Sequence, residues 1–281
     1  MVWSEIKKNL HVPFFLLAVA GIIGICLLGT GYEAADGKTY TILQLICFGW
    51  QSQEAVPIEL NQWNIWKAGQ GDWFFLVFPV FVSLGAVLTL YEERCSGQVR
   101  FQLIRCGYKQ YRRAKVSAWG LSGGLVAVVA YILFGVCVLI FFPSLQDFSK
   151  ELQRDYMRTY IPHGVVLFFV QQIAGMFLYG CLISAISGCI CALCHDRYFI
   201  LCMPVLLVYF FHQSLLKISF AVQGDNVIRR MIDVMQPESM LSVGNYSAWQ
   251  TGVQLLMLLT LYGLFDGLLA LRGKLQTEPG T

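Results

Sequence analysis

The chain has 281 residues, of which 57% are hydrophobic and 13% are charged, and its mean hydropathy is +0.60. Soluble domains carry about 25% charged residues, so a chain this apolar needs lipid to cover part of its surface. The net charge is only +3, and the basic residues lie beside apolar segments, which argues against binding to nucleic acid. Composition therefore predicts a membrane protein.

The first residues of the chain can form a short helix that precedes the first long apolar segment. Trp3, Ile6 and Leu10 recur at i, i+3 and i+7, while Glu5 and Lys8 face elsewhere. A proline then follows at position 13 and redirects the chain. This pattern is typical of an amphipathic helix that lies along the inner leaflet of a membrane.

Six segments are apolar enough to cross a bilayer as helices, which takes about 20 residues each. We expect these spans at about 12–30, 72–91, 117–142, 164–193, 198–216 and 249–271. Residues 41–49 are also apolar but too few to cross, so we expect them at the interface or packed on the protein. The fold class is an all-α membrane protein, and residues 1–281 form a single transmembrane domain.

The distribution of basic residues predicts the orientation of the spans. An even number of spans places both termini on one side, and that side holds 12 of the 20 Lys and Arg residues. Cytoplasmic loops of membrane proteins carry an excess of Lys and Arg. We therefore expect a multi-pass protein of the cell membrane with both termini in the cytoplasm. The outer side then carries loops at about 31–71, 143–163 and 217–248.

The loop between the second and third spans is strongly basic and contains a short amphipathic segment. Ser96-Gly97 allows a turn, residues 98–106 have helical periodicity, and Gly107 can supply a left-handed stop. The apolar side chains that share one face are Val99, Leu103 and Cys106. An apolar stripe of this kind suits docking into a partner's groove. The alternative is a surface loop whose arginines only contact anionic lipid.

The loop resembles that of type-2 ATP-binding-cassette (ABC) permeases. The matching residues are Glu93-x-x-Ser96-Gly97, then Leu103, Gly107, Arg112 or Arg113, and Lys115. In that family an acid and a glycine open the loop, a short coupling helix follows, and a lysine begins the next span. The predicted topology is also similar to that of the family, with an interfacial helix, six spans and an outer loop before the sixth span. Many members have proline where this chain has Gly107.

The resemblance implies the permease subunit of an exporter that moves a peptide or an amphipathic small molecule. The chain contains no G-x-x-x-x-G-K-[ST] phosphate loop, so it is expected to be no enzyme and to bind no cofactor directly. ATP and Mg would be bound by a partner ABC ATPase. The other expected partners are a second permease chain, identical or related, and membrane lipid.

The same resemblance assigns residues to the contact with the ATPase. The first group lies in and around the basic loop: Glu93, Gly97, Val99, Leu103, Arg105, Cys106, Gly107 and Lys115. A second, smaller contact is the turn between the fourth and fifth spans, with His195, Asp196 and Arg197. From the amphipathic stretch, we expect Leu103 and Arg105 to lie in the interface.

Polar residues inside spans are costly in lipid, so each is a candidate for the translocation path. The candidates are Gln171, Gln172, His212, Gln213 and Asp266. The alternative is that they bind water at the headgroup level, with Asp266 loosely paired to Arg272. Small residues at spacings of four also mark close helix contacts, within the chain or with a second one. They are Gly120 with Gly124, Gly263 with Gly267, and Gly180 with Ser184 and Gly188.

No catalytic or metal-ligating residues are expected. The ten cysteines lie mostly in apolar spans, which favours packing roles over disulfides or a metal site. An intramembrane protease of the E-E-x-x-x-R type would need arginine where this chain has Gly97. Two other functions stay open, a membrane-anchored sensor or assembly subunit and a secondary transporter that is not coupled to an ATPase.

Overall fold

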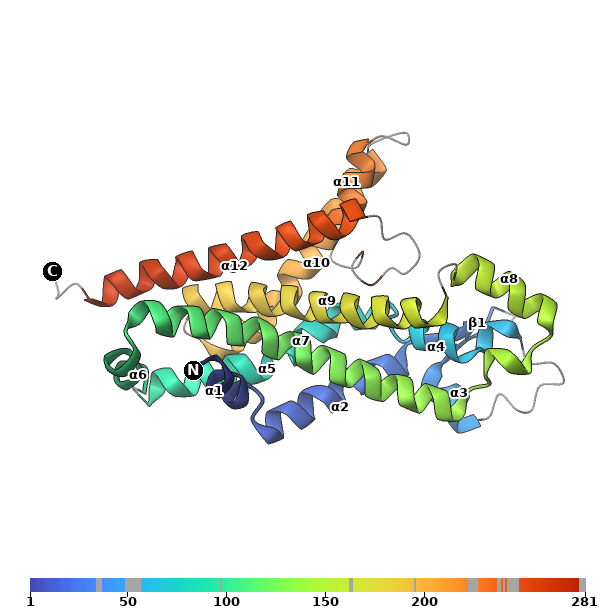
Figure 1. Ribbon diagram of the computed structural model, residues 1–281, viewed down its shortest axis with the longest axis horizontal. Helices are drawn as coiled ribbons and strands as arrows, with labels where there is room; N and C mark the ends of the chain where they lie inside the picture. Colours follow the sequence, from blue (N-terminus) through green and yellow to red (C-terminus); the bar gives the residue numbers. More distant parts are fainter. Residues whose placement is uncertain are drawn as a thin grey trace.

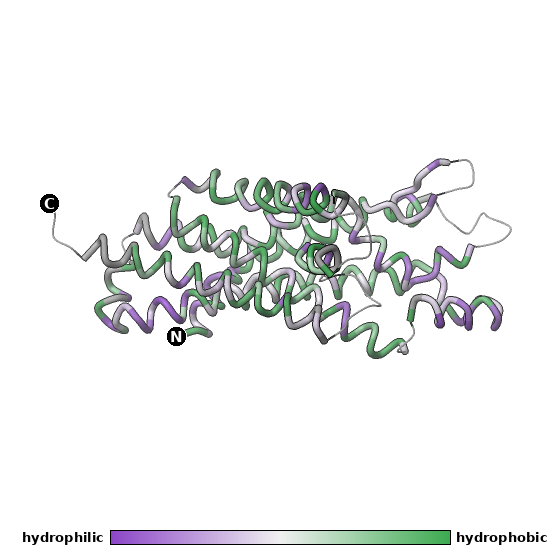
Figure 2. The backbone as a smooth tube through the Cα atoms, turned by 90° about the horizontal axis from the view of Figure 1, so that it is seen from above, coloured by the Kyte–Doolittle hydropathy of each residue, from purple (hydrophilic) through white to green (hydrophobic). Residues whose placement is uncertain are grey.

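The computed structural model describes residues 1–33, 37–48, 57–96, 98–161, 164–194, 196–221, 227–236, 239, 241 and 248–277. Long helices run roughly side by side, and both termini lie at the same end of the molecule (Figure 1). Hydrophilic stretches are concentrated near its two ends (Figure 2). The protein is an all-α membrane protein, as the composition predicted.

The long helices coincide with the predicted spans. They are α2 (Val12–Leu28), α5 (Asp72–Cys95), α7 (Tyr108–Phe141), α9 (Val165–Leu193), α10 (Arg197–Ala221) and α12 (Ala248–Thr277). Five are long and apolar enough to cross a membrane by themselves. The sixth, α2, qualifies together with the short helix α1 (Val2–Asn9), from which it is bent by 63°. The bend falls where Pro13 occupies the first turn of α2.

Shorter elements gather at the end of the molecule opposite to the termini (Figure 1). They are β1 (Thr30–Glu33), β2 (Thr39–Thr41), α3 (Ile42–Phe48), η2 (Ile58–Leu60), α4 (Gln62–Ala68), η3 (Leu145–Asp147) and α8 (Lys150–Tyr160). The strands form an antiparallel hairpin that the sequence did not predict. Ile42 and Leu45 of α3 are buried in the core, so this apolar segment packs on the protein as expected.

The third predicted outer loop also contains a helix, α11 (Val227–Met235). Ile232 and Val234 of α11 are buried, whereas Val227 and Met231 are exposed. Most of the remainder of that loop lies outside the described residues.

The centre of the bundle is the contact between α7 and α9. A Cβ atom on Gly123 would lie 2.5 Å from the Ser184 Cβ, and one on Gly180 would lie 2.8 Å from the Ala127 Cβ. These positions therefore require a residue without a side chain, because the helices approach each other too closely for one. The predicted packing of small residues within one chain is confirmed for α7 and α9.

Helix α12 packs against α7 with one face only, as far as the described residues show. The Tyr262 hydroxyl lies where a Cβ on Gly120 would stand, so α12 is in close contact with α7 there. In contrast, nothing among the described residues lies within 4 Å of a Cβ built on Gly263 or Gly267. The second glycine pair therefore makes no close contact with the described part of the chain.

The cysteines behave as the sequence predicted for most of them. Nine cysteines of the described chain form no disulfide, and Cys26, Cys181 and Cys191 are buried among apolar side chains. Cys181 also donates its thiol to the carbonyl of Gly120 at 3.3 Å, across the contact between α9 and α7.

Candidate functional site

The candidate site lies at the end of the bundle that holds both termini. There α6 (Gln98–Cys106) connects α5 to α7, and α1 lies beside the ends of the same two helices (Figure 1). The turn between α9 and α10 lies at this end as well (Figure 1). Segments that the sequence assigned to ATPase contact are thus found on one end of the molecule.

A buried network of ion pairs joins α1, α5 and α7. The Lys115 Nζ of α7 donates to the Glu5 Oε2 at 2.7 Å and to the Glu93 Oε2 at 2.6 Å. Lys8 donates to the other oxygens of the same carboxylates, at 2.9 Å to Glu5 Oε1 and at 3.2 Å to Glu93 Oε1. Two cations therefore neutralise two anions, each carboxylate accepting from both.

The network is buried except at Lys8. Lys115 is 1% exposed and Glu5 and Glu93 are 3% exposed, whereas the side chain of Lys8 is 35% exposed. Removing one member of a buried ion pair leaves an uncompensated charge, which costs far more than the pair itself contributes. Replacement of a single buried member of the network should therefore destabilise the contact between the three helices.

The pKa values of Glu5 and Lys8 in α1 shift in the directions that favour the ionised forms. Burial by itself would raise the pKa of Glu5, but the ammonium groups of Lys115 and Lys8 outweigh it and lower that pKa. Burial would likewise lower the pKa of Lys8, but Glu5 and Glu93 raise it. Both shifts favour the ionised forms of Glu5 and Lys8 in the neutral range.

Sequence reasoning identified Glu93 and Lys115 but missed Glu5 and Lys8. The predicted apolar face of α1 is split, since Ile6 is buried while Trp3 is 64% exposed. The polar side of α1 is the side that faces the bundle. The spacing of Glu5 and Lys8 at i and i+3 was visible in the sequence, but it signals only a local pair.

Three further contacts fix α1 against α5 and α7. The Asn9 side chain donates to the Ser122 Oγ at 3.3 Å, and the Thr89 hydroxyl donates to the Lys8 carbonyl at 3.3 Å. A Cβ atom on Gly85 of α5 would lie only 2.4 Å from the Asn9 carbonyl oxygen. Helix α1 therefore contacts the backbone of α5 directly.

Helix α6 begins and ends where the sequence predicted, but its exposed apolar side chains are different ones. Phe101 is 69% exposed and Ile104 is 82% exposed. Val99 and Cys106, which the sequence assigned to the docking face, are half-buried, and Arg105 is exposed. Gly97 and the side chain of Leu103 lie outside the described residues. The i, i+3 spacing of Phe101 and Ile104 was the signal for this surface.

Gly107 forms the turn between α6 and α7. Its φ is 71° and its ψ is 150°, so φ is positive as expected, but the conformation is not that of a left-handed helix. This region of backbone space is adopted almost only by glycine. Proline, with φ near −65°, does not fit this turn, and the departure from the permease pattern at Gly107 reflects its geometry.

The second predicted contact is only partly described. Asp196 is exposed, and its Oδ1 accepts the backbone N–H of Tyr198 at 2.9 Å, so it caps the start of α10. His195 and the side chain of Arg197 lie outside the described residues.

The five candidates for a translocation path lie on α9, α10 and α12. Gln172 is 1% exposed, and its Oε1 accepts from Gln70 at 3.3 Å and from the Tyr131 hydroxyl at 3.4 Å. Its own Nε2 has no hydrogen-bond partner among the described residues. Gln171, His212 and Gln213 are half-buried on α9 and α10.

Asp266 has a partner that the sequence did not predict. Its Oδ1 lies 2.6 Å from the Nε of Arg112 in α7, as an ion pair without a well-aligned hydrogen bond. The side chain of Arg272 lies outside the described residues. The pair links α12 to the start of α7, which gives Asp266 a structural contact near the candidate site.

Within the described residues, no three His, Cys, Asp or Glu side chains gather as a metal site would require. Comparison of the chain with protein-family models, with curated proteins and with solved structures found no match. The permease resemblance thus stays a prediction, and the functional argument depends on the geometry of the chain itself.

Proposed function

We propose that this protein is the permease subunit of an ABC exporter that moves a peptide or an amphipathic small molecule across the cell membrane. A separate ABC ATPase binds ATP and Mg and supplies the energy, and a second permease chain completes the transporter. In this proposal α6 and both termini face the cytoplasm. The excess of Lys and Arg at that end supports this orientation.

The observation that carries the proposal is the exposure of Phe101 and Ile104 on α6. Both side chains are largely uncovered, on a short helix at a polar end of the molecule. Exposed apolar side chains in such a place are typical of a surface that a protein partner covers. Arg105, exposed beside them, adds a cation that can pair with an acidic residue of the partner.

The ion-pair network supports a coupling role for this surface. Helix α6 is joined in sequence to α5 and α7, and the buried Lys115–Glu93 pair ties these two helices together just inside the bundle. A displacement of α6 by a partner therefore acts on both helices at once. The Glu5 and Lys8 side chains extend the same connection to α1.

The experiment compares two substitutions of exposed apolar residues at opposite ends of the molecule. Ile104→Asp changes α6, and Leu152→Asp changes α8, where Leu152 is 48% exposed. Wild type and Leu152→Asp should copurify with an ABC ATPase in stoichiometric amount. Ile104→Asp should reach the membrane at the same level but bind the ATPase about 30-fold more weakly, the usual loss for a central interface residue.

The same purified complexes distinguish the permease function from the sensor and secondary-transporter functions. Replacing the phosphate-loop lysine of the copurified ATPase should abolish export while leaving the complex assembled. If the wild-type chain purifies without an ATPase in a detergent that preserves such complexes, the sensor and secondary-transporter functions take precedence. Equal ATPase binding by Ile104→Asp and Leu152→Asp would remove α6 from the interface.

A further inference from the structure

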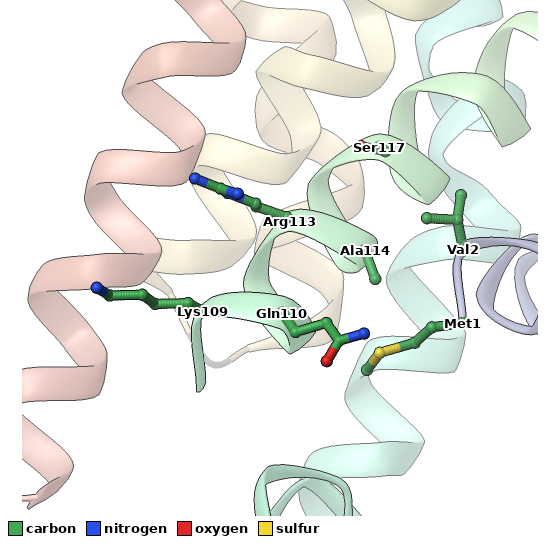
Figure 3. A pocket seen from close by; sticks show the side chains of 7 residues that line it. All are labelled: Met1, Val2, Lys109, Gln110, Arg113, Ala114 and Ser117. Carbon is green, nitrogen blue, oxygen red and sulfur yellow. The ribbon is translucent and has the colours of Figure 1, made fainter. Parts of the chain in front are cut away.

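A pocket of about 410 Å³ lies between the start of α1 and the first turns of α7. The residues that matter for its chemistry are Met1, Val2, Lys109, Gln110, Arg113 and Ser117. Figure 3 shows the Lys109 and Arg113 side chains extending from successive turns of α7 away from Met1 and Val2, so that their charged ends lie at the rim of the pocket, while the amide of Gln110 lies beside Met1. The pocket is distinct from the exposed apolar surface of α6.

The pocket offers positive charge that the described part of the chain does not neutralise. Lys109, Arg113 and Ser117 follow one another at intervals of four residues, so they share one face of α7. None of the lining residues is acidic. Neighbouring Arg112 is paired with Asp266 at 2.6 Å, but no carboxylate of the described chain forms an ion pair with Lys109 or Arg113.

The start of α7 adds a second feature that favours an anion. Gly107 precedes the helix and provides no side-chain cap, so the first backbone N–H groups of a 34-residue helix lack that partner. The positive end of the helix dipole lies at the same place. Lys109 and Gln110, in the first turn, line the pocket.

The position of the pocket along α7 matches the headgroup level of a bilayer. Residues 108–116 contain four Lys and Arg residues, and the apolar part of the helix begins at Ser117. Beside the pocket, Met1 and Val2 are exposed and Trp3 is 64% exposed. Exposed tryptophan and aliphatic side chains on a short helix are typical of the membrane interface.

We propose that this pocket binds the phosphate of an anionic phospholipid from the adjoining leaflet. The Arg113 guanidinium and the Lys109 ammonium donate to the phosphate oxygens. The Ser117 hydroxyl lies one turn deeper, where the glycerol oxygens of the lipid would be, and Met1 and Val2 form the apolar wall. The bound lipid joins α1 to α7 from outside the bundle, and the proposal is independent of any ATPase.

The test compares two double variants that remove the same charge. Lys109→Gln with Arg113→Gln removes the pocket cations, and Lys7→Gln with Arg105→Gln removes two exposed cations elsewhere at the same end. Each full-length protein is placed in nanodiscs of phosphatidylcholine with or without phosphatidylglycerol, and bound phosphatidylglycerol is counted by native mass spectrometry. Each cation that contacts the bound headgroup contributes about fivefold to affinity for anionic lipid. The pocket variant should lose about 30-fold, and the control variant should retain phosphatidylglycerol.

Several outcomes would overturn the proposal. Phosphatidylglycerol binding that is equal in the pocket variant and wild type would do so, as would an equal loss in the control variant, which indicates unspecific surface charge. Soluble glycerol phosphate that competes for the site as well as the lipid would make it a site for a free phosphate. If the pocket variant does not insert, Lys109→Gln and Arg113→Gln are measured singly, and Arg113→Lys should retain most of the binding.

Discussion

The ammonium group of Lys115 lies 2.6 Å from the carboxylate of Glu93, although 22 residues and the whole of α6 separate them in the chain. Both side chains are buried. The pair joins the two helices that flank α6, and it holds the end of α5 against the first turns of α7. Because Lys115 also donates to Glu5, the position of α1 depends on the same ammonium group.

Lys115→Met should destabilise the protein by about 3–5 kcal/mol, because two buried carboxylates lose their shared internal cation. Lys8→Gln is the matched comparison, since Lys8 contacts the same two carboxylates from a partly exposed position. An exposed pair of this kind contributes at most about 1 kcal/mol. Thermal unfolding of the purified variants in lipid measures both effects. Similar midpoints for the two variants would contradict a buried network centred on Lys115.

The contribution of Glu5 to stability should depend on pH in the acidic range. The folded protein holds the pKa of Glu5 below its ordinary value of 4.5, so the unfolded chain binds the proton more readily. The stabilisation is therefore complete above pH 4.5 and is lost as the pH falls through the lower pKa of the folded state. The gap in unfolding temperature between wild type and Glu5→Gln should stay constant at neutral pH and shrink below pH 4.5.

For Lys8 we expect a contribution to stability that is lost at high pH rather than at low pH. Its pKa is raised above the ordinary value of 10.5, so its stabilisation is present below pH 10.5 and is lost as the pH rises through the higher folded value.

For Glu5, a contradicting outcome would be a gap in unfolding temperature between wild type and Glu5→Gln that narrows already at neutral pH. That result would show that the Glu5 carboxylate is not held by these cations.

Gly85→Ala should displace α1 from the bundle. The added methyl group would lie 2.4 Å from the backbone oxygen of Asn9, which cannot turn away as a side chain would. Overpacking of this kind costs about 1–3 kcal/mol. Gly24→Ala in α2 is the control, since nothing among the described residues lies within 4 Å of its new Cβ. Protease cleavage near the N-terminus should become faster in Gly85→Ala and stay unchanged in Gly24→Ala.

Gly107→Ala should weaken the coupling between α6 and α7 without any collision of side chains. Gly107 and Gly164 both precede long helices at positive φ, 71° and 88°, and no described residue lies within 4 Å of a Cβ at either position. Alanine at either site should cost about 1–3 kcal/mol of backbone strain. Only Gly107→Ala, which lies next to α6, should also change the affinity for the ATPase of the proposed complex. Equal ATPase binding by both variants would show that this turn does not control α6.

The sequence by itself determined the long helices and the position of α6. Stretches of apolar residues that match the bilayer thickness placed most ends of the long helices to within about five residues, but α7 begins at Tyr108 rather than near 117 and α12 ends at Thr277 rather than near 271. The reason is that the hydropathy of a segment is a local property, whereas the basic start of α7 is helical without being apolar. Helix α6 was found from Ser96-Gly97 and Gly107, because the break at each end is also encoded locally.

Only the tertiary structure decided which polar residues are buried. Lys109, Arg113 and Lys115 are close together in one basic segment, yet Lys115 is 1% exposed and the other two are exposed. The periodicity of a helix shows which residues share a face, but it does not show which face another helix covers. Glu5 reaches Lys115 across 110 residues of sequence. A contact over such a distance depends on how the helices pack, and no local pattern contains that information.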